Sequence, residues 1–164
     1  MTPSTVSHDT FVVRRVYDVP VASVFRAWAD PVRKARWFAG SSDALGNGYE
    51  LDFRVGGQEV NRGGPPGGPI YTYSAQFRDI VVDQRIVFTT EMSVDEKLMS
   101  VTVSTVELRD AGDATELVMT EQGVFLDGQE TVAQREEGTR DLLESLSAAL
   151  SADQPFSTNL EELP

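Results

Sequence analysis

The hydrophobic and polar positions of this chain follow two different periods, and the change of period marks where one element ends and the next begins. Residues 10–20 are rich in β-branched and aromatic side chains and stop at a proline, which predicts a strand. Between residues 21 and 28 apolar side chains recur at helical spacing, which predicts an amphipathic helix. The dipeptide Asp30-Pro31 provides an N-cap followed by proline at the first helical position. A second short helix is therefore expected from there to Gly40.

The middle of the chain has the period of two that is typical of strands. Residues 49–55 alternate between apolar and polar side chains, and residues 58–60 predict a further short strand. The Gly- and Pro-rich segment 62–69 is expected to be a hairpin loop, since it lacks the Lys-Ser/Thr of a phosphate-binding P-loop. Four longer strands are predicted at residues 70–82, 84–92, 98–110 and 114–122.

The helical period returns between Gln129 and Leu150, which predicts a long terminal helix. Seven strands without helices between the last six predict an α+β fold with an antiparallel sheet. One face of this sheet must be covered by the terminal helix and the two short helices, and we expect a ligand cavity between them. The predicted organisation is a single domain over residues 10–150, with a loose arm at 1–9 and a tail at 151–164.

Composition narrows the classes of function. The 164 residues include 14 Lys and Arg against 26 Asp and Glu, a formal net charge of −12. Nucleic acids and anionic membranes are bound through clustered basic residues, so neither is an expected partner. The chain has no cysteine, no apolar signal segment and no apolar run long enough for a membrane span. The prediction is a soluble cytoplasmic protein.

Few residues could carry catalysis. The single histidine, His8, lies in the predicted arm, so a Ser-His-Asp triad or a histidine metal site in the core is not expected, and no metal or cofactor is predicted. Carboxylate, tyrosine and arginine chemistry remains, with Glu121, Tyr73 and Arg54 as the catalytic candidates. Arg54 could orient a substrate carboxylate together with Asp52, although a structural ion pair between strands is the simpler interpretation.

Glu121 has two interpretations that the sequence leaves open. It alternates with Leu117 and Met119, so it shares their face of the last strand. If that face turns toward the terminal helix, Glu121 would accept a hydrogen bond from a ligand or act as a general base. Alternatively, it is a rim residue paired with a basic group such as Arg135. In that case the following segment would be a joint in which Gly123 and Gly128 form the turn and Phe125 closes the core.

Aromatic and methionine side chains on the short helix and the strands are the candidate lining of a cavity. Many of them would be ordinary core in any fold, but core and cavity lining form one layer when a sheet wraps a helix. Tyr73 adds a hydroxyl to this layer, and a buried tyrosine hydroxyl generally finds a polar partner. The candidate ligand-binding residues are Trp37, Phe38, Phe53, Tyr73, Phe77, Phe88, Met92, Met99, Met119 and Glu121.

Several stretches together resemble the START/Bet v 1-like (SRPBCC) superfamily, in the branch of the C-terminal domain of the Hsp90 ATPase activator. The resemblance covers roughly residues 11–150. It implies a helix-grip fold, in which a seven-stranded antiparallel sheet wraps around the C-terminal helix and a mostly apolar pocket. Where some relatives have a Gly-Trp pair on the last helix, this chain has Gly138-Thr139, so one aromatic is missing from the pocket wall. The matching stretches are VPVASVFRAWADPVRKARWF, LDFRVGGQEV, FRDIVVDQRIVFT, ATELVMTEQGVFLDG and REEGTRDLLESL.

Three hypotheses for the function follow. The first is binding of a small hydrophobic or aromatic molecule between the sheet and the terminal helix. The second is a cyclase- or hydratase-like enzyme that uses Glu121 with Tyr73 or Arg54. The third is an interaction module for Hsp90, although the N-terminal domain through which eukaryotic co-chaperones chiefly engage Hsp90 has no room in 164 residues. A homodimer that covers the edge strands is also compatible with the sequence.

Overall fold

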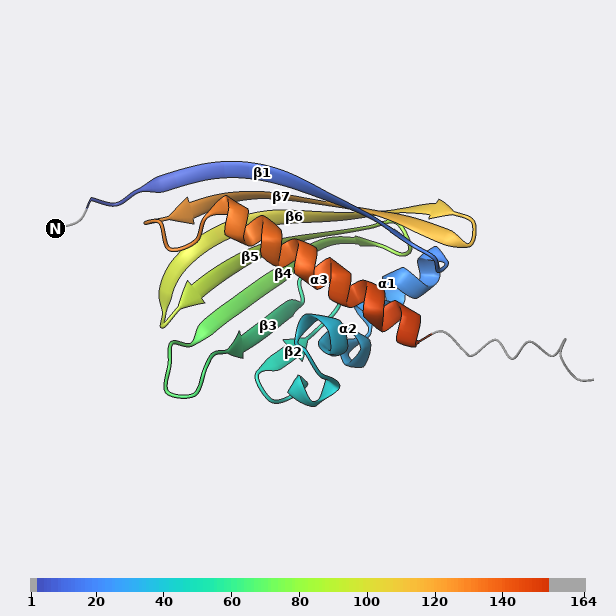
Figure 1. Cartoon of the computed structure of the whole chain (residues 1–164), viewed down its shortest axis with the longest axis horizontal. Coiled ribbons are helices and arrows are strands. Elements are labelled where there is room, and N and C mark those ends of the chain that lie inside the picture. Colours follow the sequence, from blue (N-terminus) through green and yellow to red (C-terminus); the bar gives the residue numbers. More distant parts are fainter. Residues whose placement is uncertain (1–2, 154–164) are drawn as a thin grey trace, which may run out of the picture.

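A computed structural model describes residues 3–153 as one antiparallel sheet with a long helix lying against it (Figure 1). The sheet has seven strands in the order β1-β7-β6-β5-β4-β3-β2. This confirms the predicted α+β helix-grip architecture with two short helices after the first strand. The strands are β1 (Val6–Tyr17), β2 (Tyr49–Leu51), β3 (Gln58–Gly63), β4 (Tyr71–Val81), β5 (Arg85–Val94), β6 (Lys97–Ala111) and β7 (Ala114–Leu126).

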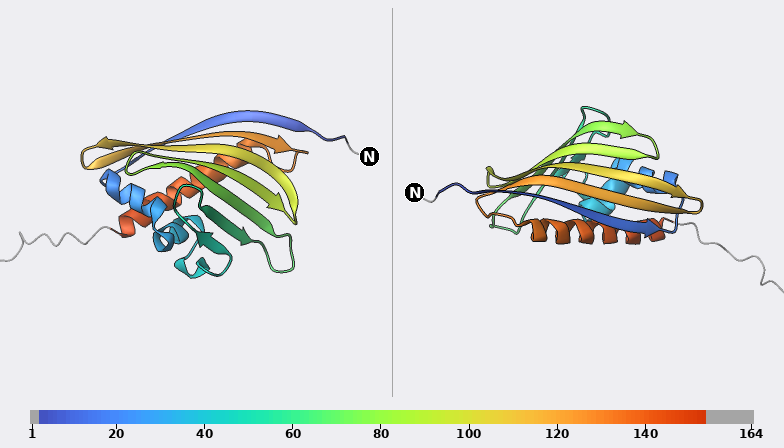
Figure 2. Two further views of the ribbon diagram at one scale, coloured as in Figure 1. Left: turned by 180° about the vertical axis from the view of Figure 1, so that it is seen from behind. Right: turned by 90° about the horizontal axis from the view of Figure 1, so that it is seen from above.

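Three α-helices cover one face of the sheet. They are α1 (Val21–Ala29), α2 (Pro31–Phe38) and α3 (Val132–Ala152), and a short 3₁₀ turn (Ser42–Ala44) follows α2. The two views of Figure 2 agree that α3 runs along the sheet, with α1 and α2 gathered near its C-terminal half. The helices therefore close one end of the space between α3 and the sheet.

The ends of the helices follow their sequence signals. Asp30 caps α2 by accepting from the backbone N–H of Arg33, and proline occupies the first turn. Thr131 and Gln134 form a complete capping box at the start of α3. The buried side of α3 carries Leu143, Leu146 and Leu150 toward the sheet. Because its first turns are fastened by the capping box, the polar residues that follow are held in place over the sheet.

Two predicted boundaries were wrong. The strand expected at residues 49–55 ends at Leu51, because the chain folds into a tight turn in which Gly56 donates to the carbonyl of Phe77. Gly57 completes this turn, since a Cβ there would lie 2.1 Å from the carbonyl oxygen of Asp52. Gly123 was expected in a turn but lies within β7, where a Cβ would come within 2.9 Å of the Thr102 side chain.

The predicted arm also needs correction. Residues 6–9 belong to β1 and pair with β7, with Val6 opposite Leu126, so His8 is an exposed strand residue. These residues form strand because the backbone of β7 offers them hydrogen-bond partners, although three of their four side chains are polar. At the other end α3 continues to Ala152, and Asp153 pairs with basic residues of α2. The remainder of the predicted tail, 154–164, lies outside the described residues.

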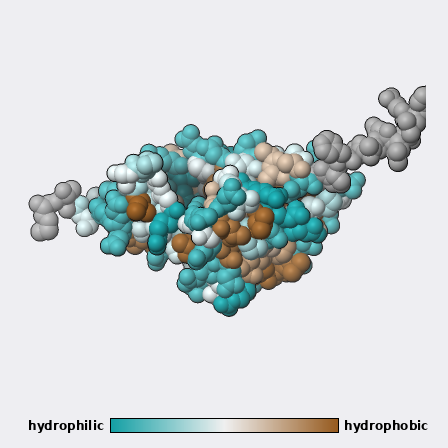
Figure 3. All heavy atoms as spheres, turned by 90° about the horizontal axis from the view of Figure 1, so that it is seen from below, coloured by the Kyte–Doolittle hydropathy of each residue, from teal (hydrophilic) through white to brown (hydrophobic). Residues whose placement is uncertain are grey.

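The surface agrees with the acidic composition. The face in Figure 3 is largely hydrophilic, with small separate apolar patches and a hollow in its left half. Within residues 3–153 no helix has the length and apolar character needed to cross a membrane. No cluster of three or more His, Asp or Glu side chains in the same range could hold a metal ion.

Candidate functional site

A cavity of about 360 Å³ lies between the sheet and α3. One part of its wall is apolar and comes from α1, α2, α3 and the three strands β4, β5 and β7. The rings of Trp28 and Trp37 meet edge-on with centroids 4.9 Å apart, and Phe38 contacts Tyr73 in the same manner at 5.1 Å. The apolar and aromatic lining residues are Trp28, Trp37, Phe38, Tyr73, Phe88, Met92, Met119, Leu142 and Leu143.

Three residues expected in the lining lie elsewhere. Phe53, beyond the end of β2, packs edge-on against Phe25 and Phe77, and Phe77 is an almost fully buried part of the same layer. Met99 sits where the pairing of β5 and β6 shifts register, and its side chain is buried there. These three side chains are buried or half-buried core and do not border the cavity. The other seven candidates do.

Arg54 is also separate from the cavity. Its Nε lies 2.8 Å from Oδ2 of Asp52, so the ion pair expected for these two residues is present, within one turn rather than between two strands. Both side chains are more than half exposed, which means that water screens the pair. Of the three catalytic candidates, only Glu121 and Tyr73 therefore face the cavity.

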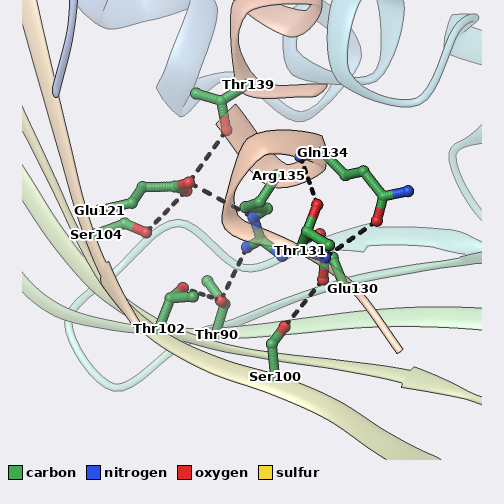
Figure 4. Close-up of polar contacts among 10 residues, drawn as sticks. All are labelled: Thr90, Ser100, Thr102, Ser104, Glu121, Glu130, Thr131, Gln134, Arg135 and Thr139. Carbon is green, nitrogen blue, oxygen red and sulfur yellow. Dashed lines mark hydrogen bonds and ion pairs between the residues drawn. The ribbon is translucent and has the colours of Figure 1, made fainter. Parts of the chain in front are cut away.

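The opposite part of the wall is polar and centres on Glu121, shown in Figure 4. Glu121 lies directly across from Ser104 in the pairing of β7 with β6, and Ser104 donates to its Oε1 at 3.2 Å. Thr139 of α3 donates to Oε2 at 3.1 Å. The predicted partner Arg135 is present as well, with its Nε 3.5 Å from Oε2. Glu121 is only 4% exposed, so it is a buried, fully partnered carboxylate and not a rim residue.

Arg135 reaches from α3 toward both the sheet and the loop that precedes the helix (Figure 4). Arg135 and Thr139 share one face of α3 because they are four residues apart. The Nη2 of Arg135 donates to Oγ1 of Thr90 at 3.3 Å, and Thr90 is hydrogen-bonded to Thr102. Its Nη1 lies 3.7 Å from Oε1 of Glu130, too far for a hydrogen bond, and this buried nitrogen has no hydrogen-bond partner.

Glu130 is the second carboxylate near Arg135. Ser100 of β6 donates to its Oε2 at 3.2 Å, and its side chain is 14% exposed. It lies immediately before the N-cap Thr131, so the capping box also fixes the backbone that carries it. The polar wall thus holds two carboxylates against one guanidinium, each positioned by hydroxyl groups of neighbouring elements.

Tyr73 lies on β4 beside this polar wall. Burial holds the pKa of its phenol well above the ordinary value, and the carboxylates of Glu59 and Glu121 add to that effect against the opposing charge of Arg135. The hydroxyl therefore stays protonated at neutral pH. It can donate a hydrogen bond but is poorly suited to proton transfer.

A second ionic cluster is buried behind the apolar wall. Nζ of Lys34 on α2 lies 2.9 Å from Oε2 of Glu59 on β3, and the hydroxyl of Tyr49 donates to the same carboxylate. Nζ also lies 4.6 Å from the ring centroids of Trp28 and Phe38, close enough for cation–π contact. Burial lowers the pKa of Lys34, and Glu59 opposes this effect.

The sequence analysis missed most of this polar chemistry. Arg135 was named only as a partner for Glu121, and Thr139 only as the replacement for a missing aromatic. One signal was available: the inward positions of β6 are Ser100, Thr102 and Ser104, a run of hydroxyls on the face that carries the core. Lys34 and Glu59 gave no such signal, since they are 25 residues apart and each looks like a surface residue of its own element.

Comparison with known proteins agrees with this architecture. Residues 18–151 match the family model described as Activator of Hsp90 ATPase homolog 1-like protein. The Mll3558 protein from Rhizobium loti is 47% identical with a TM-score of 0.82, and the match covers 88% of this chain and 99% of that one. A protein from Rhizobium leguminosarum is 37% identical with a TM-score of 0.86, covering 93% and 100%.

A more distant likeness adds information on the fold alone. DynU16, from the dynemicin biosynthetic locus, is 21% identical with a TM-score of 0.64, and the match covers 90% of this chain and 49% of that one. Among curated proteins none matches this chain.

Proposed function

This chain belongs to the Activator of Hsp90 ATPase homolog 1-like family, and from that premise we propose that it binds a small hydrophobic or aromatic molecule between the sheet and α3. The supporting observation is the cavity of about 360 Å³, which has an aromatic and methionine wall on one side and a few buried polar groups on the other. Ligand sites generally combine these two features, the apolar wall supplying affinity and the polar groups orientation.

The state of the two candidate catalytic residues favours binding over catalysis. Both carboxylate oxygens of Glu121 already accept hydrogen bonds, from Ser104 and Thr139, and Arg135 lies beside them. Each oxygen keeps a further lone pair, but a proton taken up there would compete with these three neighbouring donors for the carboxylate. The phenol of Tyr73 keeps its proton because its pKa is raised. The cyclase-like alternative would require this network to rearrange when a substrate enters.

Binding of a neutral fluorescent probe tests the proposal. The two-ring fluorophore N-methyl-1-naphthylamine should bind saturably to one site and raise the melting temperature, since a ligand that binds only the folded state stabilises it. Met92→Trp, which places a larger side chain in the cavity wall, should abolish binding while the circular dichroism spectrum is retained. Leu98→Trp adds the same volume at an exposed position outside the cavity and should bind normally. Equal binding by both variants, or no saturable binding by the natural protein, would contradict the proposal.

The ATPase rate of an Hsp90 distinguishes the interaction-module hypothesis from the ligand-binding proposal. The family's description refers to an activator of the Hsp90 ATPase, which makes a bacterial-type Hsp90 the partner to examine. A cavity-binding function predicts that the added protein leaves the ATPase rate of this Hsp90 unchanged. A rate increase that survives Met92→Trp would favour the interaction module instead.

A further inference from the structure

Two buried side-chain donors on residues that line the cavity have no hydrogen-bond partner among residues 3–153, the Nε1 of Trp28 and the Nη1 of Arg135, and only the second belongs to a charged group. The Nη1 of Arg135 is buried and has no hydrogen-bond partner within the described part of the chain. The Arg135 side chain is only 9% exposed, and it lines the cavity. A buried charged donor without a partner is costly, and native proteins rarely keep one without a reason. A ligand atom that accepts a hydrogen bond from Nη1 would remove this cost.

The charges around Arg135 decide which kind of acceptor is favoured. Glu121 and Glu130 both lie within 4 Å of the guanidinium, so two negative charges face one positive charge and the local net charge is −1. A ligand carboxylate would bring a third negative charge into this weakly screened space. A neutral oxygen, such as the carbonyl of a ketone, can accept from Nη1 without that repulsion.

The volume of the cavity limits the size of the ligand. An apolar cavity of about 150 Å³ accommodates benzene. The cavity here, at about 360 Å³, is a little more than twice as large. It suits a ligand of about two fused aromatic rings with a short polar substituent, by the same proportion. The edge-on packing of Trp28 and Trp37 offers such a ring system further aromatic contacts.

We propose, building on the function proposed above, that the cavity selects a neutral two-ring aromatic ligand whose carbonyl oxygen accepts from Arg135, and that Glu130 excludes the corresponding carboxylate. Glu130 is suited to this role because Ser100 holds its Oε2 while its Oε1 stays 3.7 Å from Nη1. It neutralises Arg135 without using the Nη1 hydrogen bond. Glu121 adds its own charge to this repulsion, but its contact with the guanidinium is at Nε, whereas Glu130 lies at the Nη1 where the ligand carbonyl would bind.

Three naphthalene probes of nearly equal size test this selectivity. They are 2-acetylnaphthalene, 2-naphthoate and 2-ethylnaphthalene, and their binding is followed by calorimetry with the full chain. We expect the ketone to bind at least about tenfold more tightly than the carboxylate, a difference of one unit in log Kd. Replacing the charge by Glu130→Gln should reduce this ratio by about tenfold, chiefly through tighter binding of 2-naphthoate. The matched control Glu137→Gln removes one charge from an exposed position of α3 and should leave the ratio unchanged.

The ethyl probe separates failure of this inference from failure of the proposed function. If none of the three probes binds, the proposed cavity function itself is wrong. If 2-ethylnaphthalene binds as tightly as the ketone, the cavity binds ligands, but the proposed hydrogen bond from Arg135 to the ligand carbonyl is refuted. An unchanged ketone-to-carboxylate ratio in Glu130→Gln would refute the role of Glu130. As a second variant, Arg135→Lys should weaken the ketone several-fold and leave 2-ethylnaphthalene unaffected, because the fixed fork of the guanidinium is lost.

Discussion

Two ionic clusters are buried in this molecule, and they differ in what surrounds them. Lys34 and Glu59 are each 1% exposed, and aromatic rings close over the ammonium group. Arg135 and Glu121 are buried to nearly the same degree, but they form the polar wall of a cavity. In the first cluster the Glu59 carboxylate is paired with Lys34 and Tyr49, and none of these three side chains has a buried polar atom without a partner. The second leaves one guanidinium nitrogen unpaired.

This difference shows that burial of a charge does not by itself indicate a binding site. Both clusters cost desolvation, and the pairing inside each cluster offsets part of that cost. The cluster of Lys34, Glu59 and Tyr49, called the sealed cluster from here on, acts on the cavity indirectly. The rings of Trp28, Trp37 and Phe38 contact Lys34 and also line the cavity. Lys34 therefore supports the positions of these aromatic rings from the side away from the cavity. The cluster of Arg135, Glu121 and Glu130, called the open cluster from here on, is the one that borders the cavity.

The largest expected effect comes from breaking the sealed pair. Lys34→Met should lower the free energy of unfolding by about 3–5 kcal/mol, because Glu59 is left as a buried, unpaired charge. Urea denaturation measures this loss. The exposed pair offers the matched control: Arg54→Met should change stability by less than about 1 kcal/mol, since its charges are screened by water. Equal losses in the two variants would show that the sealed cluster is not a desolvated ion pair.

A second variant keeps this prediction testable if Lys34→Met fails to fold. In Lys34→Met/Glu59→Gln both charges are absent, while the Gln amide oxygen can still accept from Tyr49. Most of the lost stability should return, because the unpaired charge and not the missing contact is the main cost.

A smaller loss is expected in the open cluster. Glu121→Gln should lower the free energy of unfolding by about 2 kcal/mol, the scale of a hydrogen bond to a charged group. The loss is smaller than for Lys34→Met because Arg135 retains Glu130 as a counter-charge. Urea denaturation of Glu121→Gln and of Lys34→Met under the same conditions compares the loss in free energy of unfolding between the two clusters. A larger loss in Glu121→Gln would reverse the assignment of which cluster supports the fold.

Alkaline pH should destabilise the protein through its buried tyrosines. Burial is the main cause that raises the pKa values of Tyr17, Tyr49 and Tyr73 above the ordinary value. The unfolded chain releases these protons above about pH 10 while the folded chain keeps them, so their contribution to stability is complete below that pH and is lost above it. Each tyrosine contributes a slope of about 1.4 kcal/mol per pH unit.

The pH dependence of the urea midpoint above pH 10 measures these slopes. Tyr49→Phe should remove the contribution of one tyrosine and leave the others, which isolates the part of the slope that belongs to the sealed cluster. The exposed Tyr71→Phe is the matched control. A slope that is identical in the natural protein and Tyr49→Phe would contradict the assignment.

Much of the fold could be predicted from the sequence, because its signals are local. Alternation and helical spacing placed the strands and α1, α2 and α3, and the Asp30-Pro31 dipeptide located the start of α2. Errors arose where a tertiary contact overrides the local pattern. Residues 6–9 look like an arm but pair with β7, and residues after Leu51 look like strand but turn back against Phe77.

The candidate site was only partly predictable for the same reason. Alternation put Glu121 on the face of Leu117 and Met119, and residue type made Tyr73 a candidate for the lining; the structure places both in the cavity wall. The sequence pattern could not show which residues of this layer border the cavity. Phe77 lies in the same layer but is covered by the rings of Phe53 and Phe88. Met99 was proposed for its residue type alone, and the structure buries it beside the register shift between β5 and β6, away from the cavity.

The sequence by itself therefore determined the order of the elements, the ends of the helices and the family. The tertiary structure alone decided which buried charges are sealed and which face the cavity. Lys34 meets Glu59, and Arg135 meets Glu121 and Glu130, only because α2 and α3 are laid on particular strands of the sheet. A repeat along the chain reports which side of an element is apolar. Which elements then meet, and what space remains between them, is set by packing across the whole domain.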